Sequence, residues 1–524
     1  MTDAQVEERD AGREATPPAP PDVIVISDLH IGRGKNPATG RYFNLEAFFY
    51  DRDFERFCRY ICDDAAARGV KLRLVLNGDI FDFLRVEPVD PTDEPDRVEK
   101  RRRDRTTPAA IVRIVAEILA GPPGLARGLA YVLRFAEEVI FLPGNHDLEM
   151  QWSSVQAEIR RALLAEVESQ AGEEAAKRAD QRLRFESWFY HEPGRLWIEH
   201  GCQYDPENSF TYLLRSGLES EAASVHQAEY DLPLGNFFQR YLYNAFGHMT
   251  FIVPSSRANI RYSKWLLTHE PRLLLRVLKS HVPFLWQVGR RMARYKGPAK
   301  RAMQESHEHE LSALAESSGL GDKLRSIDAL KQEHADAVAA LRALGWQLTK
   351  LAGVVLGVAV LSAGLWFAGW LAINQLRLGF GVKTLLLLIF NFLMLFGLGV
   401  GATYGFMRSA VAVSPRPLRR AAQRIIDALD VPIVTFGHTH DEELWPLSRP
   451  SGGRAWYYNT GTWIAVFTHD VLLPRERVQF TFLRVRGHEA ELLHWSPGRQ
   501  EPLPVILLDE GTRDLRQLGA PPTT

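Results

Sequence analysis

The stretch Val23-Ile24-Val25-Ile26-Ser27-Asp28-Leu29-His30 decides the fold of this chain. Its first four residues are β-branched and apolar, which is typical of a strand buried on both faces. Polar side chains follow at once, and Asp28 and His30 are separated by one residue. Open α/β sheets place ligand sites at the carboxyl ends of their strands. The stretch therefore predicts a ligand site at this edge of the sheet.

Four more predicted strands end in a polar motif. In chain order these motifs are Asn77-Gly78-Asp79, Pro143-Gly144-Asn145-His146-Asp147, Glu199-His200-Gly201 and Gly437-His438-Thr439-His440. They follow strands expected at 72–76, 139–142, 195–199 and 433–436. One such motif is common by chance, but five in series are hard to explain as core filling. We therefore expect their side chains to meet in one site.

The rest of the chain predicts a layered α/β protein. Helical patterns at 45–68 and 111–135 separate the first three strands, and Glu192-Pro193-Gly194 predicts a hairpin turn between strands at 185–190 and 195–199. Further strands are expected at 456–459, 478–485 and 490–494. Strands that alternate with helices, followed by a strand-rich end, indicate a two-sheet α/β sandwich.

A large insertion interrupts this pattern. Residues 210–346 are expected to be mainly helical and are unusually aromatic, and two uncharged stretches of 23 residues follow at 351–373 and 384–406. Each is long enough to cross about 30 Å of hydrocarbon as a helix, so we expect a transmembrane hairpin rather than two buried soluble helices. Glycines recur every four residues in both stretches, which favours close helix packing within the hairpin or with a second copy of the chain.

Positive charges near the two stretches predict their orientation. Residues 331–350 hold three Lys or Arg, residues 407–426 hold five, and the linking loop 374–383 holds two. Cytoplasmic flanks carry the excess of Lys and Arg, so the α/β sandwich is expected to face the cytoplasm.

Composition narrows the function classes. The 524 residues carry a formal net charge of −1, which argues against a dedicated nucleic-acid binder. Three cysteines (Cys58, Cys62 and Cys202) cannot form a disulfide framework, so a reducing compartment is the simpler expectation. The expected organisation is a disordered leader (1–21), an α/β sandwich domain in two parts (22–205 and 411–505), a helical insertion (206–346), the hairpin (347–410) and a C-terminal tail (506–524).

The residue types in the five motifs suit two divalent ions. Carboxylates, neutral imidazoles and an amide oxygen are ligands for manganese, iron or zinc, and manganese is our first expectation. In order, the motifs resemble the signature of the calcineurin-like metallophosphoesterases, over residues 22–205 and 430–500. The resemblance implies a four-layer sandwich of two mixed sheets flanked by helices. It also implies that Asp28, His30 and His440 hold one ion, that Asn145, His200 and His438 hold the other, and that Asp79 bridges them.

The same resemblance implies hydrolysis of a phosphate ester or pyrophosphate, with His146 as the acid or transition-state stabiliser. Within the family the chain is most similar to the UDP-2,3-diacylglucosamine pyrophosphatases, which act on a lipid precursor. It departs from them at His146, where they typically have Arg, and in its hairpin. A lipid-linked substrate is therefore expected. The alternative is a membrane-tethered phosphatase or phosphodiesterase for soluble nucleotides or phosphoproteins.

Four other parts of the sequence also lead to predictions about structure. Asp147 and Asp82 could each accept a hydrogen bond from a nearby imidazole, although Asp82 could equally be a solvated turn residue. The segment 459–463 is expected to be structural, and His307-Glu308-His309-Glu310 is expected to be a solvated helix face rather than a metal site.

Overall fold

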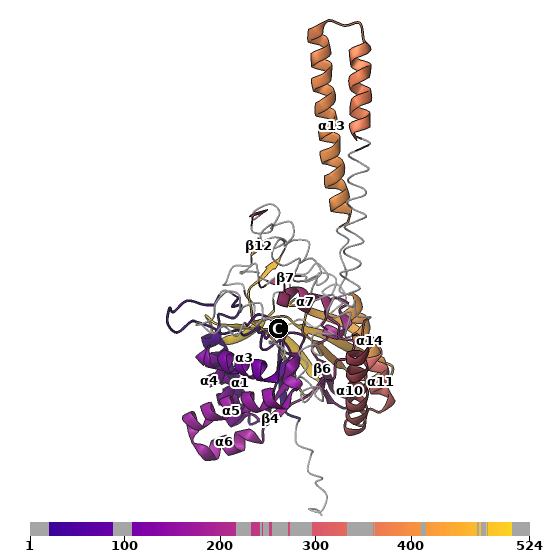
Figure 1. The fold of residues 1–524 in the computed structure, drawn as a ribbon. Coiled ribbons are helices and arrows are strands. Elements are labelled where there is room, and N and C mark those ends of the chain that lie inside the picture. Colours follow the sequence, from indigo (N-terminus) through magenta and orange to yellow (C-terminus); the bar gives the residue numbers. More distant parts are fainter. Residues whose placement is uncertain are drawn as a thin grey trace, which may run out of the picture.

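The computed structural model describes residues 20–43, 45–86, 107–215, 232–241, 296–332, 362–409, 416–468 and 480–505, with short pieces at 244, 251–253, 271–272, 360, 471–472 and 478. Its first sheet has the strand order β15-β14-β13-β1-β2-β3-β4 (Figure 1). Its strands are β1 (Asp22–Ile26), β2 (Leu72–Asn77), β3 (Glu138–Leu142), β4 (Leu183–Phe185), β13 (Thr481–Arg486), β14 (Glu489–Ser496) and β15 (Glu501–Pro504). β1 to β4 are parallel, whereas β13 runs antiparallel to β1 and pairs Val485 with Val23.

The second sheet has the order β5-β6-β8-β10-β9. Its strands are β5 (Phe189–Glu192), β6 (Leu196–Glu199), β8 (Ile433–Phe436), β9 (Glu442–Ser448) and β10 (Arg454–Thr460). β6, β8 and β10 are parallel, and β5 and β9 pair antiparallel at the two edges. Both sheets are therefore mixed, as the resemblance implies.

Alternating side chains of β1 separate the layers. Val23 and Val25 belong to a buried cluster that includes Leu196 and Ile433 of the second sheet, so the two sheets face each other. Ile24 and Ile26 point into another cluster, which the helices of the first half of the chain cover. These helices are α1 (Asp51–Ala67), α3 (Pro108–Ala120), α4 (Pro123–Phe135), α5 (Ser153–Ala171) and α6 (Glu173–Asp180).

A third cluster covers the outer face of the second sheet. It joins Val434 of β8 to helix α14 (Arg416–Leu429) and to helices α10 (Lys296–Ser317) and α11 (Asp322–Asp328) of the insertion. Three hydrophobic clusters thus separate helices, sheet, sheet and helices. The predicted α/β sandwich with two mixed sheets is confirmed.

Two predicted elements are wrong in detail. The helical pattern at 111–135 forms two helices, α3 and α4, which meet at 90°. Pro122 and Pro123 lie at the break, because proline lacks the N–H that a continuing helix needs. The strand expected at 185–190 is two strands: β4 ends the first sheet at Phe185, and β5 begins the second sheet at Phe189. The chain crosses between the sheets at this point.

Besides α10 and α11, two other described segments of the insertion contact the body. Helix α7 (Leu234–Tyr241) lies against the loop after β3, through Asn236 and Asn145. Strand β7 (Phe251–Val253) pairs in parallel with β11 (Val466–Thr468), which also pairs with β12 (Val471–Leu472) in a small third sheet. The insertion, which the sequence predicts to be mainly helical, thus also contains a strand that the sequence pattern did not indicate.

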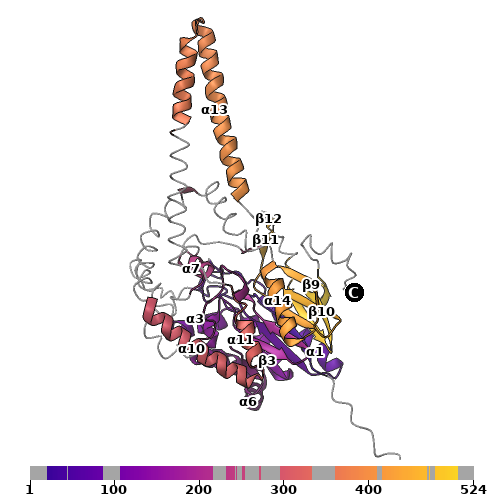
Figure 2. The same ribbon diagram turned by 90° about the vertical axis from the view of Figure 1, so that its right-hand side faces the viewer.

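The predicted hairpin is described in part. Residues 362–375 are helical and run beside α13 (Phe380–Ser409), and the two helices project away from the sheets (Figures 1 and 2). Trp366 donates from Nε1 to Oδ1 of Asn391 at 2.6 Å, so the hairpin closes on itself at this level. Residues 351–359 and 361 of the first expected span lie outside the described residues, as do the leader 1–19, the loop 87–106 and the tail 506–524.

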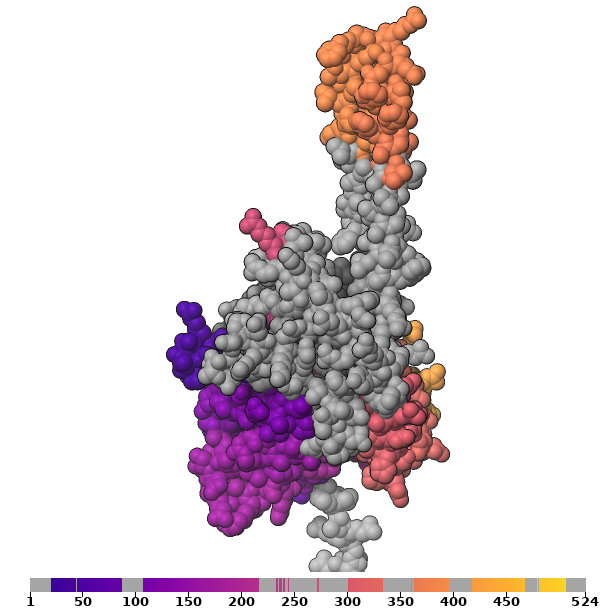
Figure 3. All heavy atoms as spheres, in the orientation of Figure 1, coloured from indigo at the N-terminus to yellow at the C-terminus, as the bar shows by residue number. Residues whose placement is uncertain are grey.

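The described part of the hairpin exposes large apolar side chains. Phe380 is 88% exposed, Phe392 67% and Leu388 63%, and Figure 3 shows this segment standing clear of the described part of the body. Within the described residues, length and hydropathy identify no single helix that could cross a membrane. The bent pair α3 and α4 passes the same test only when its two helices are taken together.

Candidate metal centre

Five loops at the carboxyl ends of β1, β2, β3, β6 and β8 form the site. Eight non-glycine residues have positive φ in the described part of the chain, and five of them lie in these loops: Asp28, His30, Asp79, His438 and His440. Left-handed backbone is costly for such residues and persists only where the surrounding structure imposes it. The strain therefore collects where the sequence predicts metal ligands.

Two motif glycines make room for these side chains. A Cβ on Gly437 would lie 2.6 Å from Oδ2 of Asp28 and 2.5 Å from Oγ of Ser27. A Cβ on Gly78, whose φ is +77°, would lie 2.5 Å from Nδ1 of His200. Any larger residue would push a polar side chain out of the centre, which explains why both motifs carry glycine.

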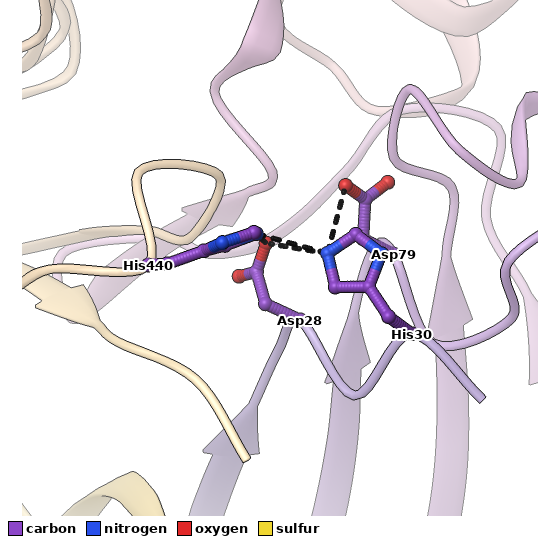
Figure 4. A group of neighbouring side chains, drawn as sticks. All are labelled: Asp28, His30, Asp79 and His440. Atoms are coloured by element: carbon purple, nitrogen blue, oxygen red, sulfur yellow. Dashed lines mark hydrogen bonds and ion pairs between the residues drawn. The ribbon is translucent and has the colours of Figure 1, made fainter. Parts of the chain in front are cut away.

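The first ligand group consists of Asp28, His30, Asp79 and His440 (Figure 4). One ligand atom from each lies within 4.8 Å of the others, and all four side chains are buried. Nε2 of His30 is 2.9 Å from Nε2 of His440 and 3.7 Å from Oδ2 of Asp79, while Nε2 of His440 is 3.2 Å from Oδ1 of Asp28. Two imidazoles and two carboxylates converging on one point can hold a divalent cation.

The second group consists of Asp79, His200 and His438, and it uses the same carboxylate of Asp79. Nε2 of His200 is 3.4 Å from Oδ2 of Asp79, the oxygen that also faces His30. Nδ1 of His438 is 3.0 Å from Oδ1 of Asn145. The structure thus brings all seven predicted ligands together in two groups, with Asp79 between them.

Hydrogen bonds on the outer sides of the imidazoles fix how they face the centre. Nδ1 of His200 lies 3.0 Å from the backbone oxygen of Asn77, an acceptor, so this nitrogen carries the proton. Nε2 is buried, and no described residue gives it a hydrogen-bond partner. A buried imidazole lone pair aimed at a carboxylate fits a cation between them.

Burial and charge act in opposite directions on two of these histidines. Burial, together with the nearby His146, lowers the pKa of His30 to about 4, so its imidazole is neutral and able to bind a metal. For His200 the effect of burial is outweighed by Asp79 and Asp28, which raise its pKa to about 10. The two carboxylates therefore attract positive charge to the centre, either a proton or a cation.

His146 and Asp82 form a pair beside the first group. Nδ1 of His146 lies 2.9 Å from Oδ1 of Asp82, and Nδ1 of His30 lies 3.4 Å from its Oδ2. Burial alone would lower the pKa of His146, but Asp82 and Asp79 outweigh it and raise that pKa. Asp82 is 1% exposed, so it is a buried partner of two imidazoles and not a solvated turn residue.

Asp147 has a different role from the expected one. Its carboxylate accepts hydrogen bonds from the backbone N–H groups of Gly144, Asp79, Ile80 and Phe81, at 2.7–3.2 Å. The expected bond to an imidazole is wrong, because the two oxygens are occupied by these four donors. Asp147 instead ties the loop after β3 to the loop that carries Asp79.

The segment 459–463 is structural, as predicted, and it supports the site. Thr462 donates from Oγ1 to the backbone oxygen of Asp28 at 2.6 Å, and Asn459 donates from Nδ2 to that of Gly437 at 2.6 Å. These bonds hold the first and last ligand loops from the same side.

Two residues of the site were missed from the sequence. Asp205 accepts a hydrogen bond from Nε2 of His438 at 2.9 Å, which leaves the lone pair of Nδ1 directed at Asn145. Asn236 of α7 exchanges two hydrogen bonds with Asn145, accepting from its Nδ2 at 3.0 Å and donating to its backbone oxygen at 2.6 Å. The only sequence signal for Asp205 was its short distance from His200, and nothing local singled out Asn236.

The run 307–310 is only partly the solvated face that we expected. Glu308 and His309 are exposed, but His307 is 2% exposed and lies 3.3 Å from Asp328. Nδ1 of His307 also accepts from the backbone N–H of Leu214 at 3.2 Å. His307 therefore joins α10 to α11 and to the body, away from the metal centre.

Comparison of the sequence with protein-family models and with curated proteins finds no match. The functional argument therefore rests on the geometry of the candidate metal centre.

Proposed function

We propose that this protein is a phosphoesterase that uses two divalent cations, with manganese as the first metal to test. One observation carries the proposal: the two ligand groups share the carboxylate of Asp79. The buried lone pair of His200, which faces that carboxylate, fits a cation at the second group. A two-metal site of this composition is suited to hydrolysis of phosphate esters or pyrophosphates.

Two bound cations would lower the pKa of a water between them and neutralise charge on phosphate oxygens. Side chains of the protein supply the proton and orient the metal ligands. Asp82 accepts from Nδ1 of His146 and so stabilises its protonated form, which can donate a proton to the leaving oxygen. Asp205 and Asn236 hold His438 and Asn145 in the orientations that binding requires.

The sandwich and the order of the ligand motifs support membership in the calcineurin-like metallophosphoesterases. Two mixed sheets with helices outside them match the fold that the resemblance implies. The five ligand loops follow β1, β2, β3, β6 and β8 in that order along the chain. The proposal therefore draws on fold and on site independently.

The hairpin supports a place at a membrane. Its described part carries large apolar side chains in contact with solvent, which is costly unless lipid or protein covers them. The excess of cations on its two flanks supports a catalytic domain on the cytoplasmic side. A lipid-linked substrate fits this location, because the insertion that carries the hairpin also places α7 against Asn145.

The test is metal-dependent hydrolysis by the full-length protein in detergent. A UDP-linked diacyl sugar, bis(p-nitrophenyl) phosphate and p-nitrophenyl phosphate would be compared with manganese, zinc and iron. Asp79→Asn should lower turnover by at least about 10²-fold and reduce the number of bound cations, whereas Asp427→Asn on the exposed side of α14 should change neither. Turnover that persists in Asp79→Asn would overturn the proposal.

The same assay separates the two substrate classes. Preference for the lipid-linked ester would connect the insertion to substrate binding. Equal or better turnover of the soluble esters would support the alternative, in which the hairpin only locates a nucleotide or protein phosphatase.

A further inference from the structure

Helix α7 brings a second residue to the metal centre besides Asn236. Arg240 lies four residues later, so both side chains project from the same face of the helix. Since Asn236 contacts Asn145 directly, Arg240 lies about 6 Å further along the helix, one turn from a predicted metal ligand.

The guanidinium of Arg240 is buried but poorly satisfied. The residue is 2% exposed, and Nη2 lies 3.4 Å from Oε1 of Glu149, a long contact for an ion pair. Within the described part of the chain, Nε and Nη1 have no hydrogen-bond partner. A buried arginine that served only the fold would be expected to form a two-pronged pair with a carboxylate.

A small pocket lies beside these groups. Asn145, Asn236, Arg240, Arg215 and Glu149 line its polar side, so that two arginines and one glutamate leave a net positive charge. Leu84 and Trp152 are among its apolar residues. Arg215 donates from Nε and Nη2 to the backbone oxygen of Tyr212, at 3.2 and 3.0 Å, so a separate contact holds it in place. The pocket thus combines positive charge, an apolar wall and an edge formed by the metal centre.

We infer that Arg240 is a specificity-determining residue, which binds a second anionic group of the substrate beside the phosphorus that reacts at the metal centre. This inference rests on the proposed function and extends it to the substrate. Arginine suits the task because its planar fork of N–H groups matches phosphate or carboxylate oxygens. A substrate with one anionic group would not use Arg240.

The experiment compares two aryl diesters, one with a single anionic phosphate and one with two, and reads the effect of each substitution on each diester against wild type. Bis(p-nitrophenyl) phosphate has a single negative charge, and P1,P2-diphenyl diphosphate has two. In Arg240→Met we expect the KM for the diphosphate to rise at least about tenfold, with unchanged KM for the monophosphate diester and unchanged kcat for both. Arg240→Lys keeps the charge and should give a smaller rise. Arg184→Met, at an exposed pair on β4, is the control and should leave both constants unchanged.

Three results would overturn the inference: an unchanged KM for the diphosphate, an equal rise for both diesters, or the same shift in Arg184→Met. If Arg240→Met does not fold, Arg240→Lys provides the test. Its KM for the diphosphate, divided by its KM for the monophosphate diester, should exceed the wild-type ratio, and an unchanged ratio would overturn the inference.

A binding measurement separates this inference from the proposed function. Imidodiphosphate should raise the unfolding temperature of the manganese-loaded wild-type protein more than that of the Arg240 variant, even without turnover. Equal shifts would overturn the role of Arg240. Absence of turnover by the wild-type protein, together with unequal shifts, would overturn only the proposed reaction.

Discussion

The candidate metal centre and the described part of the hairpin are built in opposite ways. In the centre, polar side chains are buried and every ligand loop is held by other loops, as Asp147 and Thr462 show. In the described part of the hairpin, apolar side chains face outward, and Trp366 and Asn391 supply a side-chain bond between its helices. The comparison shows that the body buries the side chains of its site within itself. The apolar side chains in the described part of the hairpin are left for lipid or another protein to cover.

Truncation of one leucine in each region should show the largest contrast. Leu74 of β2 is fully buried, so Leu74→Ala should lower the free energy of unfolding of the body by about 2–5 kcal/mol. Leu388 is 63% exposed, so Leu388→Ala should change that energy by less than about 0.5 kcal/mol. Denaturant unfolding in detergent measures both. A large loss in Leu388→Ala would mean that the hairpin packs against the body.

Removal of the charge on Asp82 tests whether a buried supporting residue matters to the centre. Asp82→Asn should weaken cation binding or activity by about 10- to 100-fold, because it disturbs the partners of both His30 and His146. Metal titration and steady-state kinetics measure the two effects, with the exposed Asp427→Asn as control. Unchanged cation affinity and unchanged activity would show that Asp82 contributes only to packing.

A methyl group added in each region should act with opposite sign. Gly437→Ala should cost about 1–3 kcal/mol and weaken cation binding, because its Cβ would collide with Asp28 and Ser27. Gly381→Ala, in α13, meets nothing within 4 Å and should stabilise the helix by up to about 1 kcal/mol. Thermal unfolding followed by circular dichroism distinguishes them. A harmless Gly437→Ala would contradict the tight centre described here.

The smallest effect is expected at Asp328, where the insertion meets the body. Burial would raise its pKa, but the hydrogen bond and charge of His307, helped by Lys331, lower it below the ordinary value. Its stabilisation is therefore present above about pH 4 and is lost as the pH falls through the lowered pKa. Asp328→Asn should cost about 1 kcal/mol at pH 7, and the difference from wild type should shrink in acid. If wild type and Asp328→Asn differed in unfolding free energy by the same amount at pH 7 and pH 3, the ionised Asp328 carboxylate would not stabilise the fold through His307 and Lys331.

The sequence predicted the parts of the fold and the site that local pattern encodes. The apolar runs of β1, β2, β3 and β8 and the polar residues after them were visible, because strand ends meet at one edge of a sheet. The proximity of Asp28 to His438, 410 residues apart, followed from that topology. The roles of these residues as ligands stay a prediction until metal binding is measured.

The remaining features depend on long-range packing that no local pattern shows. Asn236 lies on an ordinary amphipathic helix, and only the placement of α7 brings it to Asn145. The switch between sheets after Phe185 was missed because the aromatic-rich residues 185–190 were interpreted as one strand. Asp147 was misassigned because its four partners are backbone groups, which are the same in every sequence.

The antiparallel pairing of β1 with β13 determines when the first sheet and the site can form during protein synthesis. Val23 cannot meet Val485, nor Asp28 meet His438, until the ribosome has passed the whole insertion and the hairpin. At about 5–20 residues per second, the 410 residues between Asp28 and His438 take about 20–80 s to synthesise. The nascent chain therefore carries an incomplete centre throughout that time. The predicted ligand set can be complete only after the hairpin has already left the ribosome.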